Sequence, residues 1–157
     1  MDNRRGDEGS AIVEFLGLSL LLLVPLIYLV VAMARVQEAT YASEFAARSA
    51  ARAAVIEGVA LLESGESLAV AIEGAETRAM AAIELTADDF GIDPARQVSV
   101  TLACSRQPCF RPGSDIVVTV IIEVPLPGIS AGTGWMPAMI EVSATSSSAV
   151  DDYARLS

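Results

Sequence analysis

The chain has 157 residues and a formal net charge of −10, from 20 acidic and 10 basic residues, and all of the basic residues are arginine. This length allows one small domain in addition to a membrane segment, and the acidic balance argues against nucleic acid and anionic lipid surfaces as partners. Because histidine and lysine are absent, the commonest general base, transition-metal ligand and Schiff-base amine are missing. We therefore predict a protein that is not an enzyme and binds neither a metal nor a cofactor.

Residues 1–9 form a short charged segment that ends in Gly9 and is followed by Ser10. Glu14 comes one helical turn later, directly before Phe15 and a long apolar run. An ionised carboxylate at the edge of a membrane core costs on the order of 2.5 kcal/mol or more unless it is paired. If the chain were cut after Gly9, the new α-ammonium group of Ser10 would lie on the same helix face as Glu14. The carboxylate would then have a cation within reach, in its own chain or in a neighbour.

The apolar run from Phe15 to Ala34 has twenty residues without a charge, about the length that a helix needs to cross a membrane. We predict a transmembrane helix over residues 10–34. Two alternatives stay open. The stretch from Ala32 to Ala34 has the A-x-A form of a signal-peptidase site, so a cut after Ala34 would release a soluble domain. An uncleaved anchor would instead keep Met1.

Residues 35–63 are predicted to continue the same helix outside the membrane, since they are rich in alanine and contain a favourable Glu44–Arg48 pair. Small side chains recur at spacings of three and four along one face. They are Ala39, Ala42, Ala46, Ala50 and Ala53. This stripe suits packing either on the protein's own domain or between helices of neighbouring subunits.

Residues 64–157 are predicted to form a small α+β domain. A second helix is expected from Leu68 to about Thr86, capped by Ser64 or Ser67. Its apolar face contains Leu68, Ile72, Ala75, Ala79 and Ile83. The aspartates that follow this helix lack the spacing of a calcium loop.

Beyond residue 97 the apolar period changes from 3.6 to 2. Three strands are predicted, over residues 98–104, 116–124 and 140–145. The middle strand is apolar on both faces for much of its length, which favours a central position. Three consecutive strands after the helices indicate an antiparallel meander packed on helical surface.

Cys104 and Cys109 flank the turn between the first two strands. A local disulfide is our interpretation, with a reduced pair as the alternative. A disulfide that closes such a short loop would raise the free energy of unfolding by about 2 kcal/mol. The bond would also indicate an oxidising, extracytoplasmic compartment.

The stretch from Pro125 to Pro137 is predicted to be a long apolar loop. It either covers a sheet edge or binds a partner through Trp135.

The stretch from Gly9 to Phe15 resembles the type IV prepilin pattern: a charged leader ending in glycine, glutamate at the fifth mature position, an aromatic residue, and then an apolar helix. With the Ala- and Arg-rich helix that follows, it looks most like the TadE-like pseudopilins of tight-adherence (Flp) pilus systems. The specific likeness covers Arg5 to Ala54. The rest is similar only in general plan, a pilin-like domain with helices and a Ser/Thr-rich final strand.

The resemblance implies that residues 1–9 are a prepilin-type leader, which a prepilin peptidase removes by cutting between Gly9 and Ser10. Glu14 and Phe15 would belong to the processing motif. The mature protein would be a minor pseudopilin or pilus-assembly protein. Its partners would be other pilins or pseudopilins and the inner-membrane assembly machinery. It would cross the cytoplasmic membrane once, N-terminus inside, with the domain outside and, after assembly, at the cell surface or in a pilus. A bitopic protein with an extracytoplasmic binding domain and no filament role is the alternative.

Overall fold

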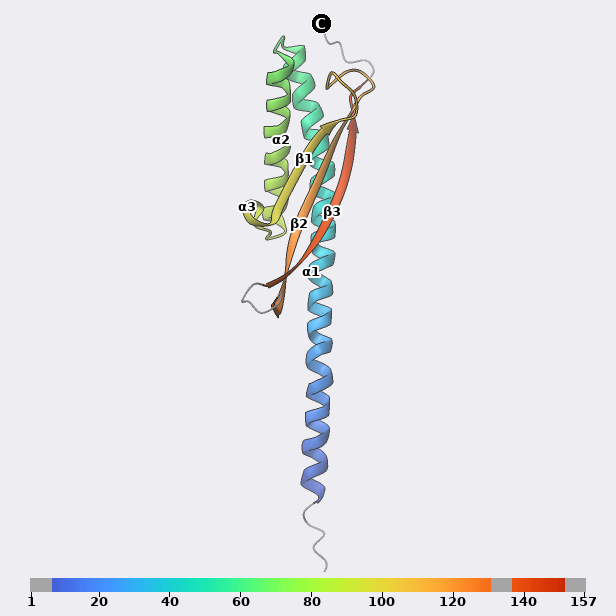
Figure 1. Ribbon diagram of the computed structural model, residues 1–157, viewed down its shortest axis with the longest axis vertical. Helices are drawn as coiled ribbons and strands as arrows, with labels where there is room; N and C mark the ends of the chain where they lie inside the picture. The colour runs from blue at the N-terminus through green and yellow to red at the C-terminus, as the bar shows by residue number, and fades with distance from the viewer. Residues whose placement is uncertain (1–6, 131–136, 152–157) are drawn as a thin grey trace, which may run out of the picture. The chain divides into compact units, whose positions relative to one another are not determined.

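The computed structural model describes residues 7–130 and 137–151 of the chain, and it has the predicted α+β composition (Figure 1). The elements, in order, are α1 (Asp7–Glu63), α2 (Leu68–Asp89), α3 (Pro94–Gln97), β1 (Val98–Cys104), β2 (Asp115–Ser130) and β3 (Pro137–Ala149). The chain divides into two compact units, Met1–Arg35 and Val36–Ser157.

The first unit contains the beginning of α1. By length and composition, α1 includes a segment apolar enough to cross a membrane, and none of that segment is buried. Aliphatic and aromatic side chains point outward all around it, as the 69% exposure of Phe15 illustrates. A helix that is apolar on every side needs an apolar environment, which is either a membrane or other helices.

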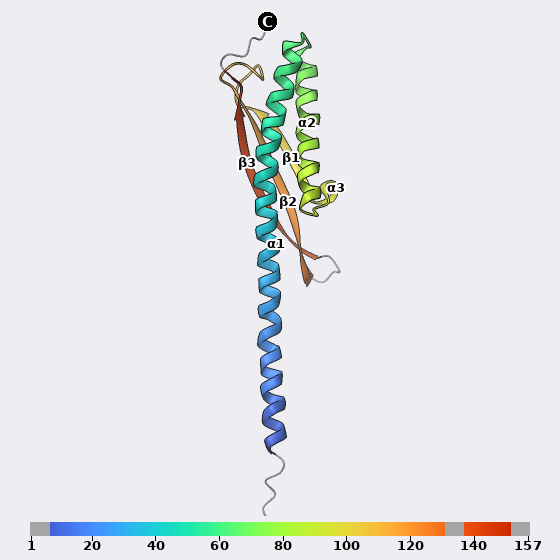
Figure 2. The same cartoon turned by 180° about the vertical axis from the view of Figure 1, so that it is seen from behind.

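In the second unit, α1 and α2 lie on the same face of a three-stranded sheet (Figures 1 and 2). Alternate residues of β2 face the helices and are buried, because successive side chains of a strand point to opposite faces. They are Ile116, Val118, Val120, Ile122 and Val124. These side chains form one hydrophobic core with the buried alanines of both helices.

The alanine stripe of α1 packs on the protein's own domain. Its buried members are Ala39, Ala42, Ala46, Ala47, Ala50, Ala51 and Ala54. The stripe is therefore wider than predicted, whereas Ala53 is only half-buried. Side chains this small let backbones approach closely but bury little area each. Since this face of α1 is used inside the domain, it is not available for contacts between subunits.

The second helix begins where the sequence predicts. Ser67 is its N-cap, and its hydroxyl oxygen accepts a hydrogen bond from the backbone N–H of Val70 at 3.4 Å. Ala75, Ala79 and Ile83 are buried as expected. The predicted apolar face of this helix is therefore confirmed, with Leu68 and Ile72 packed partly buried against the core.

The sheet is an antiparallel meander in the order β1-β2-β3, with β2 in the centre as predicted. Thr101, Thr119 and Thr145 lie level with one another across the three strands. The predicted loop from Pro125 to Pro137 is wrong at its first end, since β2 continues to Ser130. At its second end β3 begins at Pro137, so this strand is longer than the predicted one over residues 140–145. A register shift between Pro125 and Ser130 lets the hairpin continue past a proline.

Gly58 lies inside α1, and the helix continues past it to Glu63. A side chain at this position would overlap the ring of Phe110, which follows the disulfide loop. The glycine thus provides the space in which an aromatic ring packs directly against the backbone of α1.

Candidate functional site

Glu14 lies on the exposed surface of α1, and it is the only charged residue between Ala11 and Ala34. The backbone of Gly9 and Ser10 belongs to the same continuous helix. Ser10 and Glu14 are therefore one turn apart on one face, as predicted. The neighbours Ile12, Val13 and Phe15 are all largely exposed, so this carboxylate stands in an apolar surface.

A second exposed surface lies on α1 within the domain, and the sequence interpretation missed it. It contains Tyr41, Phe45, Arg52 and Ile56, which we call the outer α1 stripe. Tyr41 is 67% exposed and Phe45 is 55% exposed. Their spacing of four, seven and four residues places them on one helix face, opposite much of the buried alanine stripe. Large side chains at helical spacing in an alanine-rich helix were the signal that could have revealed it.

Charges accompany the outer α1 stripe. Arg48 lies on the same face, and its guanidinium group is 3.5 Å from the carboxylate of Glu44. This confirms the predicted i, i+4 pair. Because both side chains are exposed, the pair contributes little stability of its own.

Cys104 and Cys109 form the predicted disulfide, with their Cα atoms 5.5 Å apart. The loop between them leads Phe110 into the core, where its side chain is completely buried. Phe110 has a φ angle of 63°, a left-handed conformation that costs a non-glycine residue about 1–2 kcal/mol. The covalent loop and the packing of the ring together hold this conformation.

Replacing both Cys104 and Cys109 with serine should lower the free energy of unfolding by about 2 kcal/mol, since the unfolded chain regains the entropy of the open loop. Urea unfolding of the full chain in detergent, followed by circular dichroism, would measure the loss. Reduction of the wild-type protein should reproduce it. Unchanged stability in both cases would contradict a structural role for the bond.

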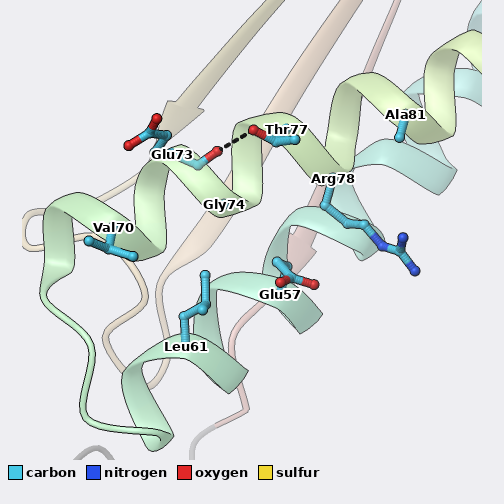
Figure 3. Close-up of a pocket in the computed structure, with 8 residues that line it drawn as sticks. All are labelled: Glu57, Leu61, Val70, Glu73, Gly74, Thr77, Arg78 and Ala81. Atoms are coloured by element: carbon cyan, nitrogen blue, oxygen red, sulfur yellow. Dashed lines mark hydrogen bonds between the residues drawn. The ribbon is translucent and has the colours of Figure 1, made fainter.

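A shallow groove of about 460 Å³ runs between α1 and α2 (Figure 3). Leu61, Val70 and Ala81 line it with apolar surface, and Glu57 and Arg78 face it from the two helices. Thr77 does not point a free hydroxyl into the groove, because its Oγ1 donates to the Glu73 carbonyl at 2.9 Å. This combination of apolar surface with one carboxylate and one guanidinium group suits packing against another side chain.

The part of the chain that the structure describes has no group of three or more histidine, cysteine, aspartate or glutamate residues that could hold an ion. Trp135, the predicted partner contact, lies outside the described residues.

Comparison of the chain with protein-family models, with curated proteins and with solved structures finds no match.

Proposed function

We propose that this protein is a membrane-anchored, TadE-like pseudopilin that joins or assists a tight-adherence pilus after removal of its leader. The observation that carries the proposal is the position of Glu14. It is a lone carboxylate at the start of an unburied apolar helix, one turn after Gly9 and Ser10. An anchor alone has no need of such a charge, whose burial in a membrane is costly.

The mechanism is electrostatic. Cleavage between Gly9 and Ser10 by a prepilin peptidase gives Ser10 a positive charge. The ammonium group of one subunit then pairs with Glu14 of a neighbour in a medium of low dielectric constant, where opposite charges attract strongly. An axial shift between the two subunits would leave both charges unpaired, so the pair favours one register.

The outer α1 stripe supplies the second part of the proposed contact. Tyr41, Phe45 and Ile56 expose large apolar surface, while the alanine face of the same helix is already buried in the domain. Aromatic side chains with an arginine beside them are typical of the centre of protein interfaces. Other pilins or pseudopilins are the proposed partners of this face.

The proposed location is the cytoplasmic membrane, with the N-terminus inside and the domain outside, and with the inner-membrane assembly machinery as a further partner. The disulfide between Cys104 and Cys109 supports this orientation, because such bonds persist mainly in oxidising compartments. The acidic domain would face away from the anionic cytoplasmic leaflet.

The test is the intact mass and N-terminal sequence of the protein from membranes of a host that contains the cognate prepilin peptidase. We expect the mature chain to start at Ser10, and to keep its leader when the peptidase is absent. A start at Met1 in both hosts would overturn the proposal in favour of an uncleaved bitopic anchor with a binding domain.

One observation favours a secreted domain as the second candidate. The second compact unit begins at Val36, two residues after the A-x-A site that ends at Ala34. Signal peptidase would then release a soluble domain that starts at Arg35. The same mass measurement separates the candidates, and this one also requires the protein to appear in the soluble extracytoplasmic fraction.

A further inference from the structure

The sheet has two open edges. Within residues 7–130 and 137–151, no strand pairs with the outer side of β1 or of β3. From Glu141 to Ala149, β3 contains no proline, glycine or lysine, and the register shift of the hairpin lies beyond this stretch. Proteins usually protect an exposed edge with such devices, so this edge is suited to pair with another strand.

The hydrogen bonds of the sheet show which backbone groups of β3 face outward. Val150 donates its N–H to the carbonyl of Ser114 at 2.8 Å, so Val150 faces the β2 side. Because facing alternates along a strand, the N–H and C=O of Thr145 face away from β2. The hydroxyls of Thr145 and Thr119 lie 2.9 Å apart, as expected for a closely spaced pair that shares no backbone hydrogen bonds.

The same reasoning applies to β1. Ser105 donates its N–H to the carbonyl of Asp115 at 2.8 Å. Because facing alternates along the strand, the backbone N–H and C=O of Thr101 face β2, and those of its neighbours Val100 and Leu102 face outward. When Thr101 and Thr145 stand level, the β3 residues whose backbone groups face outward are therefore offset by one position from the β1 residues whose backbone groups face outward.

We propose that the β3 edge of one copy of this protein pairs with the β1 edge of a second copy, in parallel, with Thr145 level with Thr101 of the second copy. In a parallel pair, a residue forms backbone hydrogen bonds with the two residues that flank the residue directly opposite it on the other strand. Thr145 would thus bond to Val100 and Leu102 of the second copy. In this register, the sheet face that lies away from the helices in one copy would also continue into the same face of the second copy, so no side chain changes face.

Charge favours this pairing. Glu123 and Glu141 stand directly opposite each other, and adjacent like charges are unfavourable. In the proposed register, Glu141 lies near the N-terminal end of β1 of the second copy, and Arg96 of that copy lies two residues before this strand, in α3. An acidic residue of the β3 edge thus meets a basic residue next to the β1 edge. Antiparallel pairing of two β3 strands about Thr145 offers Glu141 no basic residue on the partner strand, because β3 contains none.

The helix side of each edge has room for a second copy. A groove of about 370 Å³ lies between α1 and β3 and contains Arg48, Glu44 and residues 143–146. A groove of about 280 Å³ lies between α2 and β1 and contains Glu76 and Met80. Pairing of the edges would close these grooves onto each other, with Arg48 and Glu76 as opposite charges across the contact.

Such a contact is head-to-tail, so each copy keeps one open edge of each kind and the assembly can grow. It extends the proposed pilus role by naming a partner surface. It requires neither cleavage after Gly9 nor Glu14, and the two proposals can therefore fail separately.

The test is cysteine cross-linking of the full-length protein in membranes of a host without prepilin peptidase. One tagged copy carries Thr145→Cys and a second, differently tagged copy carries Thr101→Cys. We expect mild oxidation to give a mixed dimer that contains both tags and disappears on reduction. The matched control is Thr119→Cys, in the same row and on the same face but on the central strand, and it should give no dimer with either.

Two results of this cross-linking experiment would overturn the proposal. One is the absence of the mixed dimer while the native Cys104–Cys109 bond is intact by mass. The other is a dimer between two Thr145→Cys copies in preference to the mixed one, which would indicate pairing of two β3 edges. Arg96→Glu on the Thr101→Cys copy should reduce the mixed dimer severalfold, and Glu141→Arg on the Thr145→Cys copy should restore it. No rescue would refute this register.

Discussion

Replacing Glu14 with glutamine should leave the protein in the membrane, with its leader removed, but reduce its incorporation into pili by about tenfold or more. Glutamine has nearly the same shape and is cheaper to place in an apolar medium, so anchoring is preserved. The ammonium group of Ser10 in the neighbouring subunit would lose its only proposed counter-charge. A loss of about 1.4 kcal/mol per contact already changes an equilibrium tenfold, and an unpaired charge in a membrane costs more than this.

The experiment compares sheared surface material with membranes by immunoblotting, in a strain that produces only the variant. Glu63→Gln is the matched control, because it makes the same chemical change at an exposed position of the same helix, outside the proposed contacts. It should leave incorporation within about twofold of wild type, since such surface substitutions change free energies by no more than about 0.5 kcal/mol. Normal incorporation of Glu14→Gln would refute the electrostatic mechanism.

The elements that follow from local pattern were predicted correctly. The two-residue period of β1 gives its bounds of Val98–Cys104, and the cap at Ser67 marks the start of α2. Helix geometry alone places Glu14 on the face of Ser10. The disulfide follows from two cysteines on either side of one turn. In each case the information lies within a few residues of the sequence.

The features that the sequence did not reveal depend on residues far apart in the chain. Pro125 predicts a loop by local rules, yet pairing with β3 carries β2 past it to Ser130. An alanine stripe has the same period whether it packs on its own domain or on a neighbour, so only the fold shows that Ala47 and Ala54 are buried. The groove between α1 and α2 is likewise formed by two helices together.

Phe110 is the clearest such case, and its replacement by alanine should destabilise the domain by about 3–5 kcal/mol. The ring is completely buried and occupies the space that Gly58 leaves on α1. Without the ring, α1 and the disulfide loop would face a cavity that a rigid helix cannot close. Nothing in the sequence around position 110 indicates this contact, because its partner is 52 residues away along the chain.

The measurement is urea unfolding of the full chain in detergent, with Phe45→Ala as the matched control. Phe45 is the same residue type on the exposed outer α1 stripe, so its loss should change stability by no more than about 0.5 kcal/mol. Phe110→Gly separates the two roles of the position. It removes the ring as alanine does, but it relieves the left-handed strain at φ 63°, so we expect it to be about 1 kcal/mol more stable than Phe110→Ala. If Phe110→Ala were no more harmful than Phe45→Ala, the ring could not be the contact that joins the disulfide loop to α1.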